Sequence, residues 1–321
     1  MKVVITDELF DKETIPGYLP DDWEVVIVDR ATPTEDEVIE ICKDADAAIS
    51  EYAPFTKKVF EACPKLKIVS NRAMGFDNVN LDDARECKVA IANVPDYCFD
   101  EVAEHAITLI VSLLRNVPGY VIDVKNGIWN WSKGPVLKRM NKLTLGMIGC
   151  GNIPRRAAKM AQGFGMTVIA HDPYLKPELA EAAGVELVSM EELGARADAV
   201  LSHVPLSPST KGLVNKAVFD TFKKSPVFVN TSRGLTVDQP ELCKALKDGR
   251  VSRALLDVVD KEPADFSDEL FSLDNVWFTP HAAFYSEDAH EECHRRCALT
   301  VVNYLNGSKE GISFVVDPDA L

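Results

Sequence analysis

The sequence predicts an α/β protein made of two units, each a parallel β-sheet with helices on both faces. Short apolar runs alternate with helical segments along most of the chain, which is the pattern of repeated βαβ units. The 321 residues are enough for about two domains with separate cores. A buried strand, a glycine turn and a helix start follow one another only from residue 143 onward, so another unit must precede them.

Composition narrows the class of partner. The formal net charge of −15 argues against binding to nucleic acid or to an anionic membrane surface. No apolar stretch approaches the ~20 residues that a membrane span needs. The apolar run in the N-terminal MKVVITDELF is too short for the hydrophobic region of a signal peptide. Eight cysteines in a chain of this length do not suggest a disulfide framework. We therefore expect a cytoplasmic protein that binds a small molecule.

The spacing of His290, Cys293, His294 and Cys297 puts four possible metal ligands on one face of a helix. The same spacing arises in any amphipathic helix, and the sequence has no CxxC motif or second ligand pair beside it. We interpret the group as part of a buried helix face and predict no metal site.

Residues 1–93 alternate strands and helices, so they predict the first parallel sheet. The expected strands are Val3–Thr6, Glu24–Val28, Ala47–Ser50, Lys67–Ser70 and Val89–Ala92, and the expected helices include Glu35–Lys43 and Lys57–Cys63. A longer helix is predicted over Asp100–Val117, with Asp100 as its N-cap and apolar residues at helical spacing.

The segment LTLGMIGCGNIP at 143–154 has the form of a dinucleotide-binding turn. Gly149 and Gly151 break an apolar strand and precede a helix, and a second strand ends at Asp172, whose carboxylate is placed to bind ribose hydroxyls. Pro154 stands where the fingerprint has its third glycine, but proline is tolerated in a first helical turn. The region predicts a Rossmann domain that binds a dinucleotide.

Further strands are expected after the glycine turn, at Val185–Val188, Ala199–His203, Val227–Asn230, Ala254–Val258 and Val276–Thr279. Because these strands complete a Rossmann sheet, the C-terminal SFVVDPDAL should return to the first domain. We thus predict a Rossmann NAD-binding domain over 99–297, inserted into a substrate domain formed by 1–98 and 298–321. A cleft between two such domains is a common ligand site.

Three polar residues follow consecutive strands of the second half: Arg233 in VNTSRG, Glu262 in LLDVVDKEP and His281 in WFTPH. The carboxyl ends of strands in such sheets line the ligand site. Together the three supply a fork for a carboxylate, a partner for a histidine and a proton carrier.

The order and spacing of motifs over nearly the whole chain resemble the D-isomer-specific 2-hydroxyacid dehydrogenases, a family that includes phosphoglycerate, D-lactate and hydroxypyruvate or glyoxylate enzymes. The motifs that carry the resemblance are NRAMGFDNVNLDDAR, VPDYCFDEVAEHA, MIGCGNI, HDPY, HVPLSPSTKGLVN, FVNTSRG, ALLDVVDKEP and NVWFTPHAAFYS. The resemblance implies a flavodoxin-like fold for the substrate domain and NAD as the cofactor.

The resemblance also implies residue roles. Arg233 would bind the substrate carboxylate and polarise the keto oxygen, His281 would donate the proton, and Glu262 would hold His281. Backbone amides of the loop Ala73, Met74 and Gly75 would bind the same carboxylate. The implied cofactor residues, besides Gly149 and Gly151, are Val102, Asn152, Ile153, Asp172, His203, Val204, Pro205, Thr210, Thr231, Ser232 and Asp257. Asp257 would lie near the nicotinamide.

Some positions depart from the family pattern. Asn152 stands where many relatives have arginine, and Phe284 stands where glycine is frequent. The loop at residues 50–55 is aromatic and acidic and lacks the arginine that the phosphoglycerate enzymes place there, so a substrate phosphate would find no evident partner.

The sequence therefore predicts an NAD-dependent D-2-hydroxyacid dehydrogenase that reduces 2-ketoacids, with the ketoacid side chain unspecified. One alternative is a corepressor-like protein of the same fold that senses NAD, and it is disfavoured by the intact Arg233, Glu262 and His281. Another is a formate-dehydrogenase-like enzyme, in which glutamine would replace Glu262. The resemblance further implies a homodimer formed through the cofactor domain, where the helix 100–117 and the Trp129 and Trp131 connector would fit the interface.

Overall fold

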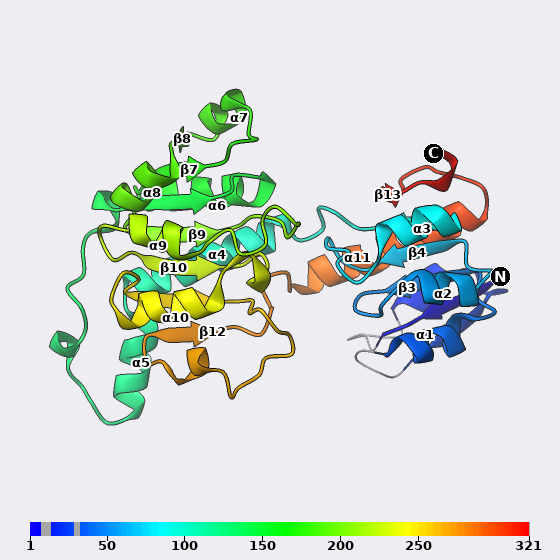
Figure 1. The fold of residues 1–321 in the computed structure, drawn as a ribbon, viewed down its shortest axis with the longest axis horizontal. Coiled ribbons are helices and arrows are strands. Elements are labelled where there is room, and N and C mark those ends of the chain that lie inside the picture. Colours follow the sequence, from blue (N-terminus) through cyan, green and yellow to red (C-terminus); the bar gives the residue numbers. More distant parts are fainter. Residues whose placement is uncertain (8–13, 29–32, 321) are drawn as a thin grey trace. The chain divides into compact units, whose positions relative to one another are not determined.

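A computed structural model describes residues 1–7, 14–28 and 33–320. The chain forms two compact units, Met1–Tyr97 with Ser286–Leu321 and Cys98–Tyr285 (Figure 1). The first boundary lies within one residue of the expected one. The second lies between Tyr285 and Ser286 rather than after residue 297, because the whole of helix α11 (Glu287–Leu305) packs on strands of the first unit.

The sheet of the first unit has six strands within the described residues, in the order β13-β5-β4-β3-β1-β2. Strands β1 to β5 are parallel and follow the flavodoxin-like order, as predicted. β13 runs antiparallel to β5, so the C-terminal segment returns to this unit but the sheet is not wholly parallel. The strands are β1 (Lys2–Ile5), β2 (Glu24–Ile27), β3 (Ala47–Ser50), β4 (Ile68–Asn71), β5 (Ala90–Ala92) and β13 (Phe314–Val316).

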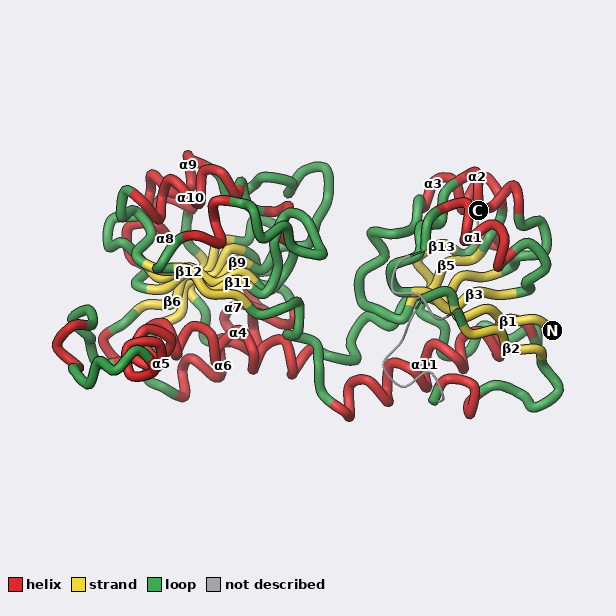
Figure 2. Tube along the Cα trace, turned by 90° about the horizontal axis from the view of Figure 1, so that it is seen from below, coloured by secondary structure: helices red, strands yellow, loops and turns green. Residues whose placement is uncertain are grey.

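Helices cover both faces of this sheet, as Figure 2 shows. One face carries α1 (Glu35–Cys42), α2 (Lys57–Ala62) and α3 (Leu81–Cys87), and the other carries α11. Two separate apolar cores result among the residues of this unit that the structure describes. Val4, Val69 and Ile91 point into the core under α1 to α3, whereas Ile5, Ile68 and Val301 belong to the core under α11. The alternation of side chains along each strand accounts for this division.

The second unit has a seven-stranded parallel sheet within the described residues, in the order β12-β11-β10-β9-β6-β7-β8. The order reverses between β6 and β9, which is the switch point of a Rossmann sheet. The strands are β6 (Thr144–Ile148), β7 (Thr167–His171), β8 (Glu186–Leu187), β9 (Ala199–Ser202), β10 (Val227–Asn230), β11 (Arg253–Leu256) and β12 (Val276–Phe278).

The helices of this unit lie on both faces of its sheet (Figure 2). They are α4 (Phe99–Leu114), α5 (Val117–Lys125), α6 (Asn152–Gly163), α7 (Pro177–Ala182), α8 (Met190–Arg196), α9 (Lys216–Thr221) and α10 (Gln239–Lys247). The predicted helix over 100–117 is α4, but its N-cap is Cys98 rather than Asp100. Asp100 lies in the first turn and forms an ion pair with Arg156.

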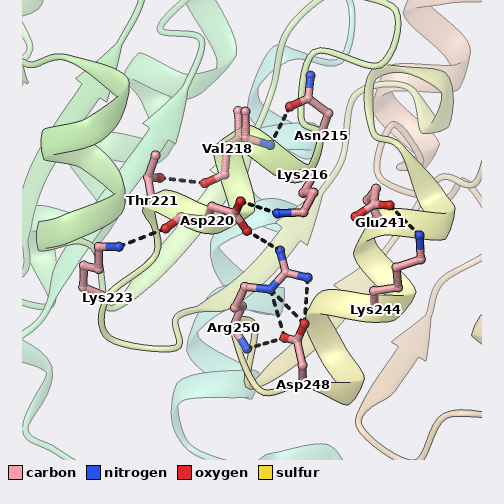
Figure 3. Close-up of polar contacts among 11 residues, drawn as sticks. Asn215, Lys216, Val218, Asp220, Thr221, Lys223, Glu241, Lys244, Asp248 and Arg250 are labelled. Atoms are coloured by element: carbon pink, nitrogen blue, oxygen red, sulfur yellow. Dashed lines mark hydrogen bonds and ion pairs between the residues drawn. The ribbon is translucent and has the colours of Figure 1, made fainter.

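An ion network ties α9 to the turn after α10 (Figure 3). Arg250 donates to Asp220 at 2.8 Å and to Asp248 at 2.7 Å, and Lys216 donates to Asp220 at 2.5 Å. These residues lie in the segments that lead into β10 and β11. The network therefore links two segments that precede their strands, whereas ligands in such folds bind beyond the carboxyl ends of the strands.

Helix α5 and the segment after it expose an unusual amount of apolar surface. Trp129 is 89% exposed, Trp131 82% and Val136 96%, and about half of Val121 is exposed. Among the described residues no single helix is long and apolar enough to cross a membrane, and the bent pair α4 and α5 meets that criterion only by length and composition.

Candidate active site and cofactor site

The predicted dinucleotide turn lies at the switch point between β6 and β9. Gly149 has a φ of +89°, and a Cβ at this position would come within 2.5 Å of the carbonyl oxygen of His203. Only glycine fits a left-handed backbone in such close contact with a neighbouring strand end. Gly151 is the N-cap of α6, and a Cβ there would meet open space. The turn thus leaves room for close approach of a ligand to the start of α6, where an anion is favoured.

Helix α6 accommodates Pro154 in its first turn, as predicted. Asn152 is exposed and Ile153 is buried. Arg155 donates to the carbonyl oxygen of Cys150 at 2.8 Å and to Oδ1 of Asn152 at 2.7 Å. This arginine lies beside the glycine turn and was not singled out from the sequence, because a single cation on a helix carries no pattern.

Asp172 follows β7, next to the glycine turn. Its Oδ2 accepts a hydrogen bond from the amide of Cys150 at 2.9 Å, and its Oδ1 accepts from the amides of Tyr174 and Leu175 at 3.0 and 3.1 Å. The carboxylate therefore fixes the end of β7 relative to the end of β6. It also lies at the edge of the sheet where the ribose is predicted to bind.

His203, Val204 and Pro205 follow β9. The Nδ1 of His203 lies 3.2 Å from the hydroxyl of Thr231. Burial, with a smaller contribution from the charge of Arg233, lowers the pKa of His203 to about 4. The histidine is therefore neutral at neutral pH and acts as a hydrogen-bonding group rather than as a cation. Thr210 lies in the same loop, where its hydroxyl donates to the Pro205 carbonyl.

The loop that carries Arg233 is shaped by Asn230 at the end of β10. Oδ1 of Asn230 accepts from both the amide and the hydroxyl of Ser232 at 3.0 Å, and its Nδ2 donates to the Arg233 carbonyl at 3.0 Å. Thr236 donates to the same carbonyl at 2.7 Å. The backbone on both sides of the arginine is thus held before any ligand arrives.

His281 and Glu262 form a pair, as predicted. Nδ1 of His281 lies 2.6 Å from Oε2 of Glu262, and each side chain is 35% exposed. The other oxygen of Glu262 accepts from the amide of Val259 at 3.1 Å. The carboxylate fixes the plane of the imidazole, so its Nε2 is the atom that remains to exchange a proton with a ligand.

Asp257, at the end of β11, supports the His281 loop. Its carboxylate accepts hydrogen bonds from the hydroxyl of Thr279 at 2.6 Å and from the amides of Ala282 and Ala283 at 2.9 and 3.1 Å. Nε2 of His105, on α4, lies 3.1 Å from the same hydroxyl. Burial opposes ionisation of Asp257, but the hydrogen bonds from His105, Thr279 and the two amides outweigh it and lower the pKa.

This support explains an uncommon backbone. His281 has a φ of +51°, and its amide donates to the Asp257 carbonyl at 2.9 Å. A left-handed conformation is costly for a residue with a Cβ, so it persists only where its surroundings impose it. His105 and Thr279 were not identified from the sequence. The signal available was a histidine within an otherwise apolar helix face.

The structure brings Arg233, Glu262 and His281 to the carboxyl edge of three adjacent strands, β10, β11 and β12. A guanidinium that can bind a carboxylate and an imidazole oriented by a carboxylate are the groups needed to add or remove a proton at a carbonyl oxygen. The carboxylate of Asp257 holds the backbone that follows His281 in place.

The loop Ala73, Met74 and Gly75 belongs to the first unit, where it follows β4. The residue before it, Arg72, is 5% exposed and forms an ion pair with Glu51, and its Nη1 lies 2.9 Å from Nε2 of His294. The histidine face of α11 is thus packed against an arginine. In residues 1–7, 14–28 and 33–320, no three His, Cys, Asp or Glu side chains are grouped to hold a metal ion.

Comparison with known proteins gives the family. Residues 107–283 match the model of the D-isomer specific 2-hydroxyacid dehydrogenase NAD-binding domain. Over 96% of its length the chain is 34% identical to a D-3-phosphoglycerate dehydrogenase of Methanocaldococcus jannaschii, although it spans only 58% of that protein. It is 35% identical to a glyoxylate reductase of Korarchaeum cryptofilum, with 88% of this chain and 85% of that protein aligned.

A solved structure agrees. The D-lactate dehydrogenase of Aquifex aeolicus, determined with NAD and lactic acid, matches 99% of this chain and 100% of its own with a TM-score of 0.89 and 26% identity. The motifs, the strand orders and the matched relatives therefore lead to one conclusion. The chain is a member of the D-isomer specific 2-hydroxyacid dehydrogenase family, and its second unit is the family's NAD-binding domain.

Proposed function

We propose that the protein is an NAD-dependent D-2-hydroxyacid dehydrogenase that reduces 2-ketoacids. The observation that carries this proposal is the 2.6 Å pair of His281 and Glu262, presented on strand ends adjacent to the one that bears Arg233. A protein that only bound NAD would have no need of a proton carrier held by a carboxylate beside a guanidinium.

The residues of the second unit fit the cofactor. The open space at Gly151 and the first turn of α6 suit a pyrophosphate, and Asp172 stands at the end of the next strand, where its carboxylate would accept from ribose hydroxyls. We assign Val102, Ile153, His203, Thr210 and Thr231 to the surroundings of the same cofactor. Bound NADH supplies the hydride that reduces the keto carbon.

The side chains of this unit supply the remaining steps. Arg233 would hold the substrate carboxylate in a bidentate contact and polarise the keto oxygen. The protonated His281 would donate its Nε2 proton to that oxygen as negative charge develops on it. Glu262 would stabilise the imidazolium before transfer and keep the ring oriented. One proton and one hydride convert the ketoacid into the hydroxyacid, so the reaction balances.

In the first unit, we assign the backbone amides of Ala73, Met74 and Gly75 to the substrate carboxylate. For the rest of the substrate, we propose an unphosphorylated ketoacid. Arg72 is buried in contacts with Glu51 and His294 and so is not offered to a phosphate. The ring of Phe284 lies 6.3 Å from that of His281, which favours a small or apolar substituent on that side.

The direct test is NADH oxidation by the purified protein with glyoxylate, hydroxypyruvate, pyruvate, branched and aromatic 2-ketoacids and 3-phosphohydroxypyruvate. We expect turnover of at least one unphosphorylated 2-ketoacid and loss of that turnover in His281→Ala. NADH binding without turnover of any ketoacid would favour an NAD-sensing protein instead. Reduction of NAD by formate would favour the formate-dehydrogenase alternative.

We also propose that the protein is a cytoplasmic homodimer and that α5 with the Trp129 and Trp131 segment forms the interface. The exposed Val121, Trp129, Trp131 and Val136 are unfavourable in water, and burial by a second copy would remove that cost. Light scattering should give twice the mass of 35.4 kDa, and Val121→Lys with Trp131→Lys should give the monomer. A wild-type monomer would refute the interface.

A further inference from the structure

In the loop after β4, residues 73–76, the carbonyl oxygens of residues 73–75 accept hydrogen bonds, whereas the amides of residues 73–76 donate none among the described residues. The oxygen of Ala73 accepts from the amide of Val94 at 3.1 Å. The oxygen of Met74 accepts from Nδ2 of Asn93 at 2.7 Å, and that of Gly75 accepts from Nδ2 of Asn71 at 2.7 Å. Among the described residues, none accepts a hydrogen bond from the amides of residues 73–76.

The geometry of the peptide bond links these two facts. In a trans peptide the C=O of one residue and the N–H of the next point in opposite directions within one plane. Fixing the carbonyl of Met74 therefore directs the amide of Gly75 away from Asn93, and fixing that of Gly75 directs the amide of Phe76 away from Asn71. Successive amides aimed away from the protein's own acceptors form a binding place for an anion.

The two asparagines are themselves held in position. Asn93 is 8% exposed, its Oδ1 accepts from the hydroxyl of Ser313 at 3.1 Å, and its amide donates to the carbonyl of Ser313 at 3.1 Å. Asn71 is fully buried and exchanges hydrogen bonds with Asn78 at 3.0 and 3.3 Å. Because each side-chain oxygen already accepts from a partner, each Nδ2 is the atom turned toward the loop.

We propose that Asn93 and Asn71 are positioning residues, which orient the amides of the loop 73–76 toward the carboxylate of the substrate. The inference rests on the proposed function, because it takes a 2-ketoacid as the anion. Neither asparagine touches the substrate. Each acts through a carbonyl, and loss of either donor lets the peptide rotate and turns an amide out of place.

The test compares the wild type with Asn93→Asp and Asn71→Asp. Aspartate has nearly the same shape, but its carboxylate cannot donate and would repel the carbonyl oxygen that lies 2.7 Å away. The matched control is Asn303→Asp in the same unit. Nδ2 of Asn303 also donates to a backbone carbonyl, that of Glu310 at 3.0 Å, but both residues are far in sequence from the loop 73–76. Should either aspartate variant fail to fold, as judged by circular dichroism, the corresponding serine variant replaces it.

We measure KM and kcat with the best ketoacid, and binding of oxamate, an unreactive carboxylate of similar shape, to the protein saturated with NADH. Loss of a well-aligned hydrogen bond to an ionised group corresponds to about a tenfold or larger change in affinity. We expect KM and the oxamate dissociation constant to rise by about tenfold or more in both loop variants, with kcat and NADH affinity within about threefold of the wild type. The control should match the wild type.

Each result bears on the inference. Unchanged KM and oxamate binding in both loop variants, or a fall in kcat without a change in KM, would overturn it. If the wild type turned over no ketoacid, the proposed function would fail by itself. The oxamate titration would still decide the role of the asparagines, because weaker binding in the variants would support the role and absence of oxamate binding to the wild type would overturn it.

Discussion

Two alanine substitutions in the glycine turn should separate a requirement of the fold from a requirement of the cofactor. At Gly149, a φ of +89° and a Cβ within 2.5 Å of the His203 carbonyl oxygen and 2.9 Å of Val204 leave no room for a side chain. At Gly151, the backbone has an ordinary φ of −68° and a Cβ meets open space. The same chemical change is therefore expected to have opposite consequences at the two positions.

The magnitudes follow from the local geometry. For Gly149→Ala, the left-handed backbone costs about 1–2 kcal/mol. Separating the ends of β6 and β9 to relieve the contact with His203 adds about 1–3 kcal/mol. The free energy of unfolding should fall by about 2–5 kcal/mol, a large part of the ~5–15 kcal/mol typical of a domain. For Gly151→Ala, the change at an N-cap should stay below about 1 kcal/mol.

Affinity for the cofactor should be lowered by the substitution at Gly151, although that substitution has little effect on stability. The methyl group of Gly151→Ala would occupy the space over the start of α6 where a pyrophosphate must approach the backbone closely, so the NADH dissociation constant should rise by about tenfold or more. The assays are urea unfolding followed by circular dichroism and NADH binding followed by fluorescence. Gly163→Ala is the control, because it lies at the other end of α6 with nothing within 4 Å of its Cβ.

Wild-type stability in Gly149→Ala would contradict the structural role of this glycine, because the contact with the His203 carbonyl would then be relieved at no cost. Unchanged NADH affinity in Gly151→Ala would contradict the proposed approach of the pyrophosphate to the start of α6. A loss of stability in Gly163→Ala would show that any added methyl group on this helix is harmful, and the comparison would lose its meaning.

Four further predictions concern single side chains. Arg233→Ala should lower kcat/KM for the ketoacid by about a thousandfold or more, and Arg233→Lys should recover only part, since a point charge cannot replace the bidentate fork; near-native kinetics in the alanine variant would contradict the role. Glu262→Gln should lower kcat for reduction, because a neutral amide replaces the charged acceptor that holds Nδ1 of His281; an unchanged kcat would exclude the pairing. The wild type should prefer NADH over NADPH by about a hundredfold in kcat/KM, and Asp172→Ala should narrow that ratio mainly by weakening NADH; equal wild-type values would show that the carboxylate does not face the ribose. Burial, and to a smaller extent the neighbouring Arg72 and His290, lowers the pKa of His294 to about 3. Below about pH 6.5 the unfolded chain therefore binds a proton at His294 that the folded protein does not bind, so stability should fall on acidification. Urea unfolding at pH 7 and pH 5 should show this loss of stability, and His294→Gln should reduce it by up to about 1.4 kcal/mol per pH unit.

Much of the fold could be predicted because apolar runs of strand length leave few alternatives in a βαβ pattern. Strands β3 and β10 begin and end where the sequence predicts. The direction of β13 could not be predicted, since the chain reaches it through helix α11 from the second unit and not by a crossover from another strand of the same sheet. Helix α5 was missed because Pro118 and Gly119 suggest a break, although proline is acceptable in a first turn.

Part of the geometry of the candidate site was predicted. Arg233, Glu262 and His281 could be singled out as candidates because each follows a strand of the same sheet, and His281 and Glu262 do form a pair. The supports of the site were not found. His105 reaches Thr279 from 174 residues away in the chain, and Asn93 is oriented by Ser313 from 220 residues away. Contacts of this kind depend on tertiary packing, so a local sequence pattern does not predict them.

The product of the reaction gives the sharpest test of the proposed dehydrogenase activity. The wild-type protein, NADH and the preferred 2-ketoacid are incubated, and the 2-hydroxyacid formed is resolved by chiral chromatography while the loss of NADH is followed by its absorbance. We expect one D-2-hydroxyacid for each NADH consumed, and no product from His281→Ala on the same time scale. An L or racemic product, or undiminished product from His281→Ala, would contradict it.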